Sequence, residues 1–226
     1  MNHISPDIGG RRPLVIWGAS GHAKVVADVA RLSGWTVAGF LDDTQRSATG
    51  IPFYGATVLG GLDEWLATNA GRGDLSIALG VGDNAARIGA VTRITRAGMS
   101  LVSVIHPAAI VSVSAQLGAG CAIMAGAVVQ ADVRLGAGVI VNTRAGIDHD
   151  CDIAVGCHLS VNATLAGKAI LEKGVTVGPG AVICAGRRVG EFAVIGAGAV
   201  VVRDIPANVV AVGVPARAIR SVVTPP

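Results

Sequence analysis

The chain has 226 residues, of which 51% are hydrophobic and 15% charged, so it can bury a large core and form more than one domain. Its formal net charge is only +3 and it has no long basic run, which argues against a nucleic-acid-binding surface. No stretch approaches the roughly 20 unbroken apolar residues that span a bilayer, which excludes a transmembrane helix. Residues 1–13 lack the apolar segment of a secretory signal, and the four cysteines show no C-x-x-C spacing. We therefore expect a cytoplasmic protein with free thiols.

The first part of the chain alternates apolar strands with helical segments. The expected elements are a strand at 13–17, a helix at 23–34, strands at 36–41 and 75–79, a helix at 85–98, and a segment at 101–105 that leads onward. Because strands that alternate with helices form parallel sheets, residues 13–104 are predicted to be a small Rossmann-like α/β domain.

A glycine-containing turn, G-A-S-G-H, joins the first strand to the first helix. Free N–H groups at such a turn suit an anionic ligand, and the acidic pair D-D at the end of the next strand suits a ribose hydroxyl. The full G-x-G-x-x-G fingerprint is absent, so a tight turn that simply needs glycine stays an open alternative. The G-x-S-x-G hydrolase elbow is rejected, since histidine replaces its last glycine. The candidate binding residues are Gly18, Ser20, Gly21, His22, Asp42 and Asp43.

A six-residue repeat fills the second part of the chain. From Ile105 to Val201 every sixth residue is Ile, Leu or Val, and four residues after each lies a small or apolar residue, with Arg187 as the exception. This period fits neither a helix nor an alternating strand, but it is typical of a parallel β-solenoid in which each hexad forms one short strand and a corner. We expect the solenoid to cover residues 105–206 in between about five and six coils, followed by a tail at 207–226.

The stretch I-D-H-D-C-D at 147–152 contains several metal-ligand types. The register assigns Ile147 and Cys151 to the interior, and adjacent residues of a strand point to opposite sides, so a shared metal ion is disfavoured. Cys121, Cys151 and Cys157 all occupy the small inward position and are interpreted as core fillers. His149 is predicted either to point inward or to lie at an edge that opens onto a cleft. A hydrogen-bonded structural histidine is the alternative to a functional one.

The two parts together resemble a known family. The repeat is similar to the left-handed β-helix acyltransferases. With the α/β domain before it, the chain resembles the bacillosamine and perosamine N-acetyltransferases and the sialic acid O-acetyltransferases from about Leu14 to Arg217. The motifs that carry the resemblance are G-A-S-G-H-A-K-V-V, F-L-D-D, A-L-G-V-G-D-N, I-H-P-A-A, N-T-R-A-G-I-D-H-D-C and V-G-V-P-A-R. The resemblance implies left-handed coiling, which the repeat alone does not determine.

The resemblance also implies an activity and its residues. It implies that His149 removes a proton from a sugar amine or hydroxyl as that group attacks acetyl-CoA, with Asp150 as the supporting carboxylate. Asp150 is shorter than the glutamate that some members carry. Asn142 and His158 are implied to position the reactants. Acetyl-CoA is implied to lie along the β-helix near Gly167 and Ala197, in a homotrimer whose active sites lie between subunits, and no metal is implied.

Three functions are weighed. The leading hypothesis is an acetyl-CoA-dependent N-acetyltransferase for a UDP- or GDP-linked amino sugar, in polysaccharide biosynthesis. The alternatives are a sugar O-acetyltransferase of the sialic acid type and a non-catalytic scaffold that binds nucleotide sugars. The acceptor distinguishes the two enzymes, and binding of acetyl-CoA distinguishes an enzyme from a scaffold.

Overall fold

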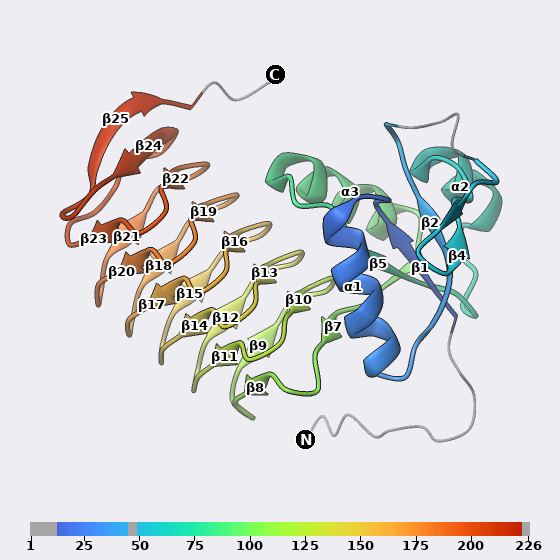
Figure 1. The fold of residues 1–226 in the computed structure, drawn as a ribbon, viewed down its shortest axis with the longest axis horizontal. Coiled ribbons are helices and arrows are strands. Elements are labelled where there is room, and N and C mark those ends of the chain that lie inside the picture. Colours follow the sequence, from blue (N-terminus) through green and yellow to red (C-terminus); the bar gives the residue numbers. More distant parts are fainter. Residues whose placement is uncertain (1–12, 45–48, 223–226) are drawn as a thin grey trace.

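The computed structural model describes residues 13–44 and 49–222. Figure 1 shows an α/β domain, blue to green, packed beside the first coils of a β-helix that runs to the red C-terminal strands. The fold class expected from the sequence is confirmed, and the β-helix is left-handed with about six turns. None of the described helices is long and apolar enough to cross a membrane. Residues 1–12, on which the expectation about a secretory signal depends, lie outside the described part. Residues 13–104 and 105–206 remain our proposed domain boundaries.

The N-terminal domain is a four-stranded sheet in the order β2-β1-β5-β6, with every pairing parallel. Its elements are β1 (Pro13–Trp17), α1 (Gly21–Leu32), β2 (Thr36–Leu41), β3 (Pro52–Phe53), β4 (Ala56–Thr57), α2 (Leu62–Asn69), β5 (Ser76–Leu79), α3 (Asn84–Arg96) and β6 (Ser100–Leu101). The expected strands and helices are present, although α1 begins and ends two residues before its predicted bounds. The sequence analysis missed α2 and the β3–β4 hairpin.

Alternating residues of the sheet divide the core of this domain into two layers. Leu14 and Ile16 pack with α1 on one face, and this cluster continues into Val104, Ala122 and Ile140 of the β-helix. The other face packs against α2 and α3. Helix α1 is therefore the layer between the sheet and the β-helix, and it fixes how the two domains meet.

The β-helix is built from two-residue strands joined by four-residue corners. Its strands are β7 (Val104–Ile105), β8 (Ile110–Val111), β9 (Gln116–Leu117), β10 (Ala122–Ile123), β11 (Val128–Val129), β12 (Arg134–Leu135), β13 (Ile140–Val141), β14 (Gly146–Ile147), β15 (Asp152–Ile153), β16 (His158–Leu159), β17 (Thr164–Leu165), β18 (Ile170–Leu171), β19 (Thr176–Val177), β20 (Val182–Ile183), β21 (Arg188–Val189), β22 (Val194–Ile195) and β23 (Val200–Val201). Each strand from β7 to β20 pairs in parallel with the third strand after it, so three sheets form a prism. We call the sheet that begins at β7 the first sheet, that from β8 the second and that from β9 the third.

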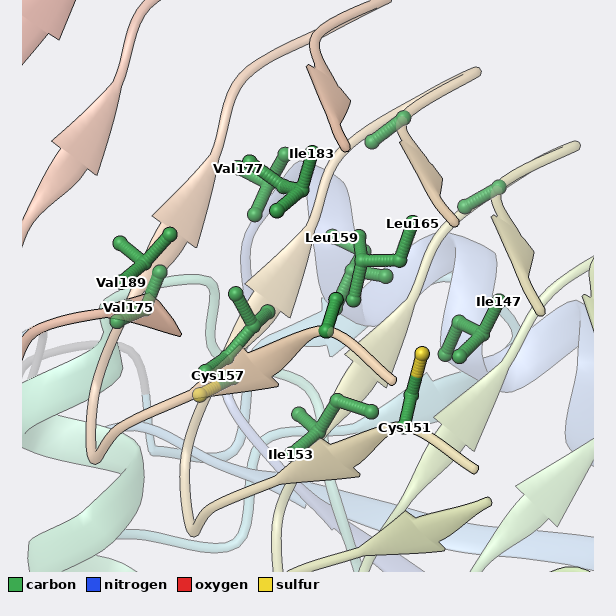
Figure 2. Packing of buried hydrophobic residues seen from close by; sticks show 14 of the residues in the cluster. Ile147, Cys151, Ile153, Cys157, Leu159, Leu165, Val175, Val177, Ile183 and Val189 are labelled. Atoms are coloured by element: carbon green, nitrogen blue, oxygen red, sulfur yellow. The ribbon is translucent and has the colours of Figure 1, made fainter. Parts of the chain in front are cut away.

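The interior of the prism is buried and largely aliphatic. Figure 2 shows Ile147, Cys151, Ile153, Cys157 and Leu159 pointing into it, and each is at most 1% exposed. The interpretation of the three corner cysteines as core fillers is confirmed, because all are buried. Their thiols donate to carbonyl oxygens of the next coil, as from Cys157 Sγ to Glu172 O at 3.0 Å.

The segment after residue 206 contains two further strands. β24 (Val209–Val212) extends the first sheet in parallel beside β22, and β25 (Arg217–Ser221) pairs antiparallel with β24. Figure 1 shows this red hairpin at the end of the prism that lies away from β7. The tail therefore lengthens the first sheet beyond the last coil.

Truncation of an inward residue should destabilise the prism. Leu159 is fully buried in a middle coil, whereas Leu32 on α1 is 61% exposed. We expect Leu159→Ala to lower the free energy of unfolding by about 2–5 kcal/mol and Leu32→Ala by under about 1 kcal/mol. Urea unfolding at one protein concentration checks this, and equal losses in the two variants would contradict the assigned register.

Candidate active site

The N-terminal domain covers the outer face of the first sheet. Outward residues of neighbouring coils form a row there, with Ile140 paired to His158 and His158 paired to Thr176. Asn84, the first residue of α3, crosses the interface and donates from Nδ2 to Thr176 Oγ1 at 2.9 Å and to Gly174 O at 2.8 Å. The carboxyl edge of the parallel sheet, where ligands of such sheets bind, therefore lies close to His158.

The turn between β1 and α1 has the geometry of an anion-binding turn. Gly18 has φ +118°, and a Cβ there would lie 2.7 Å from the carbonyl oxygen of Gly80, so only glycine fits. The N-cap residue Ser20 makes no side-chain capping bond, and the first turn of α1 holds no acidic residue. The N–H groups at this helix end are therefore available to an anionic ligand.

His22 and His158 form a half-buried pair of rings beside this turn. Their ring centroids are 6.3 Å apart. Burial, together with the nearby Arg87 cation, lowers the pKa of each ring to about 4, and His22 lowers that of His158 further. Nε2 of His22 is buried, and among the described residues it has no hydrogen-bond partner. Both rings are neutral at pH 7, and one of them has an unused polar atom.

Asn142 fixes the tautomer of His158. The backbone N–H of Thr143 donates to Asn142 Oδ1 at 2.8 Å, which leaves the Asn142 Nδ2 group 3.2 Å from His158 Nε2. An amide nitrogen only donates, so His158 Nε2 accepts and the ring proton lies on Nδ1. The structure thus brings together His22, His158 and Asn142, three of the residues singled out in the sequence.

The acidic pair after β2 already has partners within the domain. Asp42 is 7% exposed and accepts from the backbone N–H and the hydroxyl of Thr44. Asp43 accepts from Trp17 Nε1 at 3.1 Å, from the N–H of Leu62 at 2.7 Å and from Arg93. Asp43 therefore caps α2. Contact of either carboxylate with a ribose stays a prediction.

His149 lies at an exposed corner between the second and third sheets. Its side chain is 54% exposed, and Nδ1 lies 2.8 Å from Asp150 Oδ2. The hydrogen bond that His149 Nδ1 donates to Asp150 raises the pKa of His149, and the charge of Asp148 raises it further. Asp150 reaches the ring because its backbone is left-handed, with φ +60°, a conformation that Asp tolerates better than most residues. The question that the sequence left open is settled: His149 lies at the edge.

Gly167, one coil further, forms the seat of the His149 ring. A Cβ at Gly167 would lie 2.7 Å from both Cε1 and Nε2 of the imidazole. Nδ1 faces Asp150, so Nε2 is the ring nitrogen that remains for a reactant. The corner therefore holds an exposed imidazole, oriented by a carboxylate and supported by a glycine.

The predicted site residues are divided between two corners of one chain. His149, Asp150 and Gly167 lie between the second and third sheets, whereas Asn142 and the exposed Ala197 lie between the first and second. A cavity of about 250 Å³ beside His158 is lined by Asn84, Thr176 and Phe192, among others. A groove of about 290 Å³ on the second sheet is lined by Gly146, Asp148 and Thr164, among others. In residues 13–44 and 49–222, no three His, Cys, Asp or Glu side chains are placed to share a metal ion.

Arg87 was missed in the sequence. It is fully buried and forms hydrogen bonds to both domains. A single arginine in a helical segment is ordinarily exposed, so no local signal marked it. Only the neighbouring A-L-G-V-G-D-N loop was noted, and Asn84 is part of it.

The chain is similar to a known family model and to solved acetyltransferase structures. The PglD N-terminal domain family model matches residues 13–94. A variant of perosamine N-acetyltransferase from Caulobacter crescentus, solved with CoA and GDP-perosamine, is 39% identical, with a TM-score of 0.86 over 95% of this chain and 98% of that one. The acetyltransferase domain of PglB from Neisseria gonorrhoeae, solved with acetyl coenzyme A, is 37% identical, with a TM-score of 0.86 over 93% of this chain and all of that one.

A curated relative matches a shorter region. The 2,3,4,5-tetrahydropyridine-2,6-dicarboxylate N-acetyltransferase of Alkaliphilus metalliredigens is 55% identical over 126 residues, which is 52% of this chain and 53% of the relative. The chain thus spans about half the length of that relative. The family is assigned from the two solved structures, because the chain covers nearly all of each at a sequence identity of more than a third. The chain belongs to the hexapeptide-repeat sugar acetyltransferases that carry a PglD N-terminal domain.

Proposed function

We propose that the protein is an acetyl-CoA-dependent N-acetyltransferase that acts on the amine of a nucleotide-linked amino sugar. The observation that carries the proposal is the exposed His149–Asp150 pair seated on Gly167. The chain that holds this pair is similar over nearly its whole length to an enzyme solved with CoA and GDP-perosamine. That likeness favours an amine over a sugar hydroxyl as the acceptor.

The proposed reaction needs one base and no covalent intermediate on the protein. The neutral sugar amine attacks the acetyl carbonyl carbon, and His149 Nε2 takes the amine proton as the new C–N bond forms. The C–S bond then breaks, and CoA leaves as a thiolate that receives the proton from the imidazolium. Asp150 holds the ring through Nδ1 and stabilises the charged imidazolium.

The donor is proposed to lie along the corner that holds His149. Gly167 has no side chain next to the His149 ring, so a thioester can approach both the imidazole and the backbone of Gly167. Ala197 lies on a different corner, and we propose that it contacts acetyl-CoA from a neighbouring subunit.

The acceptor is proposed to bind at the N-terminal domain. Its diphosphate would receive hydrogen bonds from the Gly18–His22 turn at the start of α1, and Asp42 and Asp43 would face the nucleoside. His22, His158 and Asn142 would contact the sugar as neutral hydrogen-bonding groups, because both ring pKa values lie far below 7. The unpartnered Nε2 of His22 supports this arrangement.

We further propose a homotrimer with shared sites. The base lies at the corner between the second and third sheets, whereas the proposed acceptor face is the outer face of the first sheet, so a single chain does not bring them together. Three parallel prisms would place the His149 corner of one subunit beside the His158 face of the next.

The proposed reaction is tested with a panel of UDP- and GDP-linked 4-amino sugars in an assay of thiol release. We expect fast release with one of these amines, and a fall in kcat/KM of about 10²- to 10⁴-fold for His149→Ala, because the base is lost. His106→Ala is the matched control. Near-normal rates in His149→Ala, or faster release with a free sugar hydroxyl, would count against the proposal.

The role of Asp150 is tested by the pH dependence of kcat/KM. Activity falls where His149 becomes protonated, and Asp150 raises the His149 pKa. Asp150→Asn should therefore move the acidic limb to lower pH and reduce the plateau. Asp132→Asn is the control, because Asp132 is exposed and has φ +59° at the same corner one coil earlier. An unmoved limb in Asp150→Asn would remove Asp150 from the mechanism.

Shared sites are tested by mixing equal amounts of two variants, each of which lacks one histidine of the proposed site. His149→Ala and His158→Ala subunits, exchanged into mixed trimers, should restore about a quarter of the wild-type activity, because one site in four receives both intact histidines. Light scattering checks that the particle is a trimer. No recovery after proven subunit exchange would place both histidines in the same subunit's site.

A further inference from the structure

Arg87 of α3 is a fully buried cation that donates to both domains. Nε donates to Gly138 O at 2.6 Å, and Nη2 donates to Gly156 O at 2.8 Å and to Cys157 O at 3.3 Å. On the other side, Nη1 donates to Val81 O at 3.1 Å and to Gly82 O at 2.9 Å. One planar group thus joins the loop after β5 to two corners of the β-helix.

Within residues 13–44 and 49–222 no carboxylate bonds to this guanidinium, although the charge of Asp83 favours the cation. Among the described residues Arg87 forms no ion pair, and its remaining partner is the amide oxygen Oδ1 of Asn84, 2.8 Å from Nη2. Burial of a charge without a counter-ion is costly, and neutral hydrogen bonds offset only part of that cost. A nonpolar residue would fill the same space without the desolvation cost of a charge. We therefore attribute the role of this position to the planar set of N–H donors of arginine.

The loop held on one side supports the anion-binding turn. Gly80 donates to Trp17 O at 2.7 Å, and its carbonyl oxygen is the atom that excludes a side chain at Gly18. Val81 and Gly82, which accept from Arg87, follow directly. A shift of this loop would therefore move the Gly18–His22 turn.

The corners held on the other side lead into the first sheet. Cys157 O accepts from Arg87, and His158 is the next residue. Helix α3 lies directly against this corner, since a Cβ on Gly156 would lie 2.2 Å from Ile88. The guanidinium therefore fixes the start of the strand that carries His158.

We propose that Arg87 is a positioning residue that sets the distance between the Gly18–His22 turn and His158, and through it the affinity for the acceptor. The inference rests on the proposed function for the identity of the ligand that bridges the two sides. Arg87 itself is buried behind both and contacts no reactant. Its charge also lowers the pKa of His22 and of His158, which supports neutral rings facing the acceptor.

The test compares Arg87→Lys and Arg87→Met with Arg96→Met, a matched change at an exposed residue of the same helix. Lysine keeps the charge but lacks the planar fork, so both Arg87 variants should raise the acceptor KM by at least about tenfold. The acetyl-CoA dissociation constant, measured by calorimetry, should stay within about twofold of wild type, since that ligand is proposed to lie at other corners. Arg96→Met should behave as wild type.

Each other result decides against the proposal. An unchanged acceptor KM in both Arg87 variants would show that the fork sets no distance that matters. If both variants lost acetyl-CoA binding and also lost the circular dichroism spectrum of the folded protein, Arg87 would be a general structural residue. Failure of the proposed function has a different signature: the wild-type protein would release no thiol with any acceptor. In that case the affinity for GDP and UDP is measured by calorimetry in place of the acceptor KM. The inference would be overturned if the variants bound these nucleotides as tightly as wild type, or if the wild-type protein bound neither.

Discussion

Stacking of the coils through backbone hydrogen bonds is the constraint on which the rest of the structure depends. Gln130 N donates to Ile147 O at 3.0 Å, and Asp148 N donates to Leu165 O at 2.9 Å. Each coil thus repeats the one before it at a spacing of three hexads, and the place of a residue in its hexad determines where its side chain goes. The same rule buries Cys151 and leaves His149 at a corner two residues before it. It also stacks Gly167 under the His149 ring. The arrangement of the side chains at this corner therefore follows from the backbone repeat of the β-helix.

The two domains differ in how much of them the sequence could predict. The β-helix repeats a local rule, so its strands, its interior and its cysteines were all predictable from spacing. The N-terminal sheet followed from its apolar strands, but α2 has only Leu62 and Leu66 buried and gave little periodic signal. Arg87 was unpredictable, because its partners lie some 50 and 70 residues away in sequence. The exposure of His149 was not predictable from strand alternation, because His149 lies in the corner between β14 and β15 and not in a strand.

Two environments give histidines of opposite character. At the corner, the hydrogen bond with Asp150 favours the protonated ring and raises the pKa of His149, which suits a group that must accept a proton. At the interface, burial and the Arg87 cation favour the neutral rings of His22 and His158. Such rings are poor bases, but as neutral hydrogen-bonding groups they are well suited to hold a polar ligand. Under the proposed function, proton transfer belongs to the corner between the second and third sheets, whereas positioning of the acceptor belongs to the outer face of the first sheet and to α1.

This separation is tested most directly by titration of the imidazole groups by NMR, with signals assigned from His22→Ala, His149→Ala and His158→Ala. The chain has five histidines, so each signal can be followed. The expected result is that His149 titrates above the ordinary histidine value of about 6.5, whereas His22 and His158 stay neutral until about pH 4. If His149 titrated at or below the ordinary value while the other two titrated near it, the division between a base and two neutral binding groups would be contradicted.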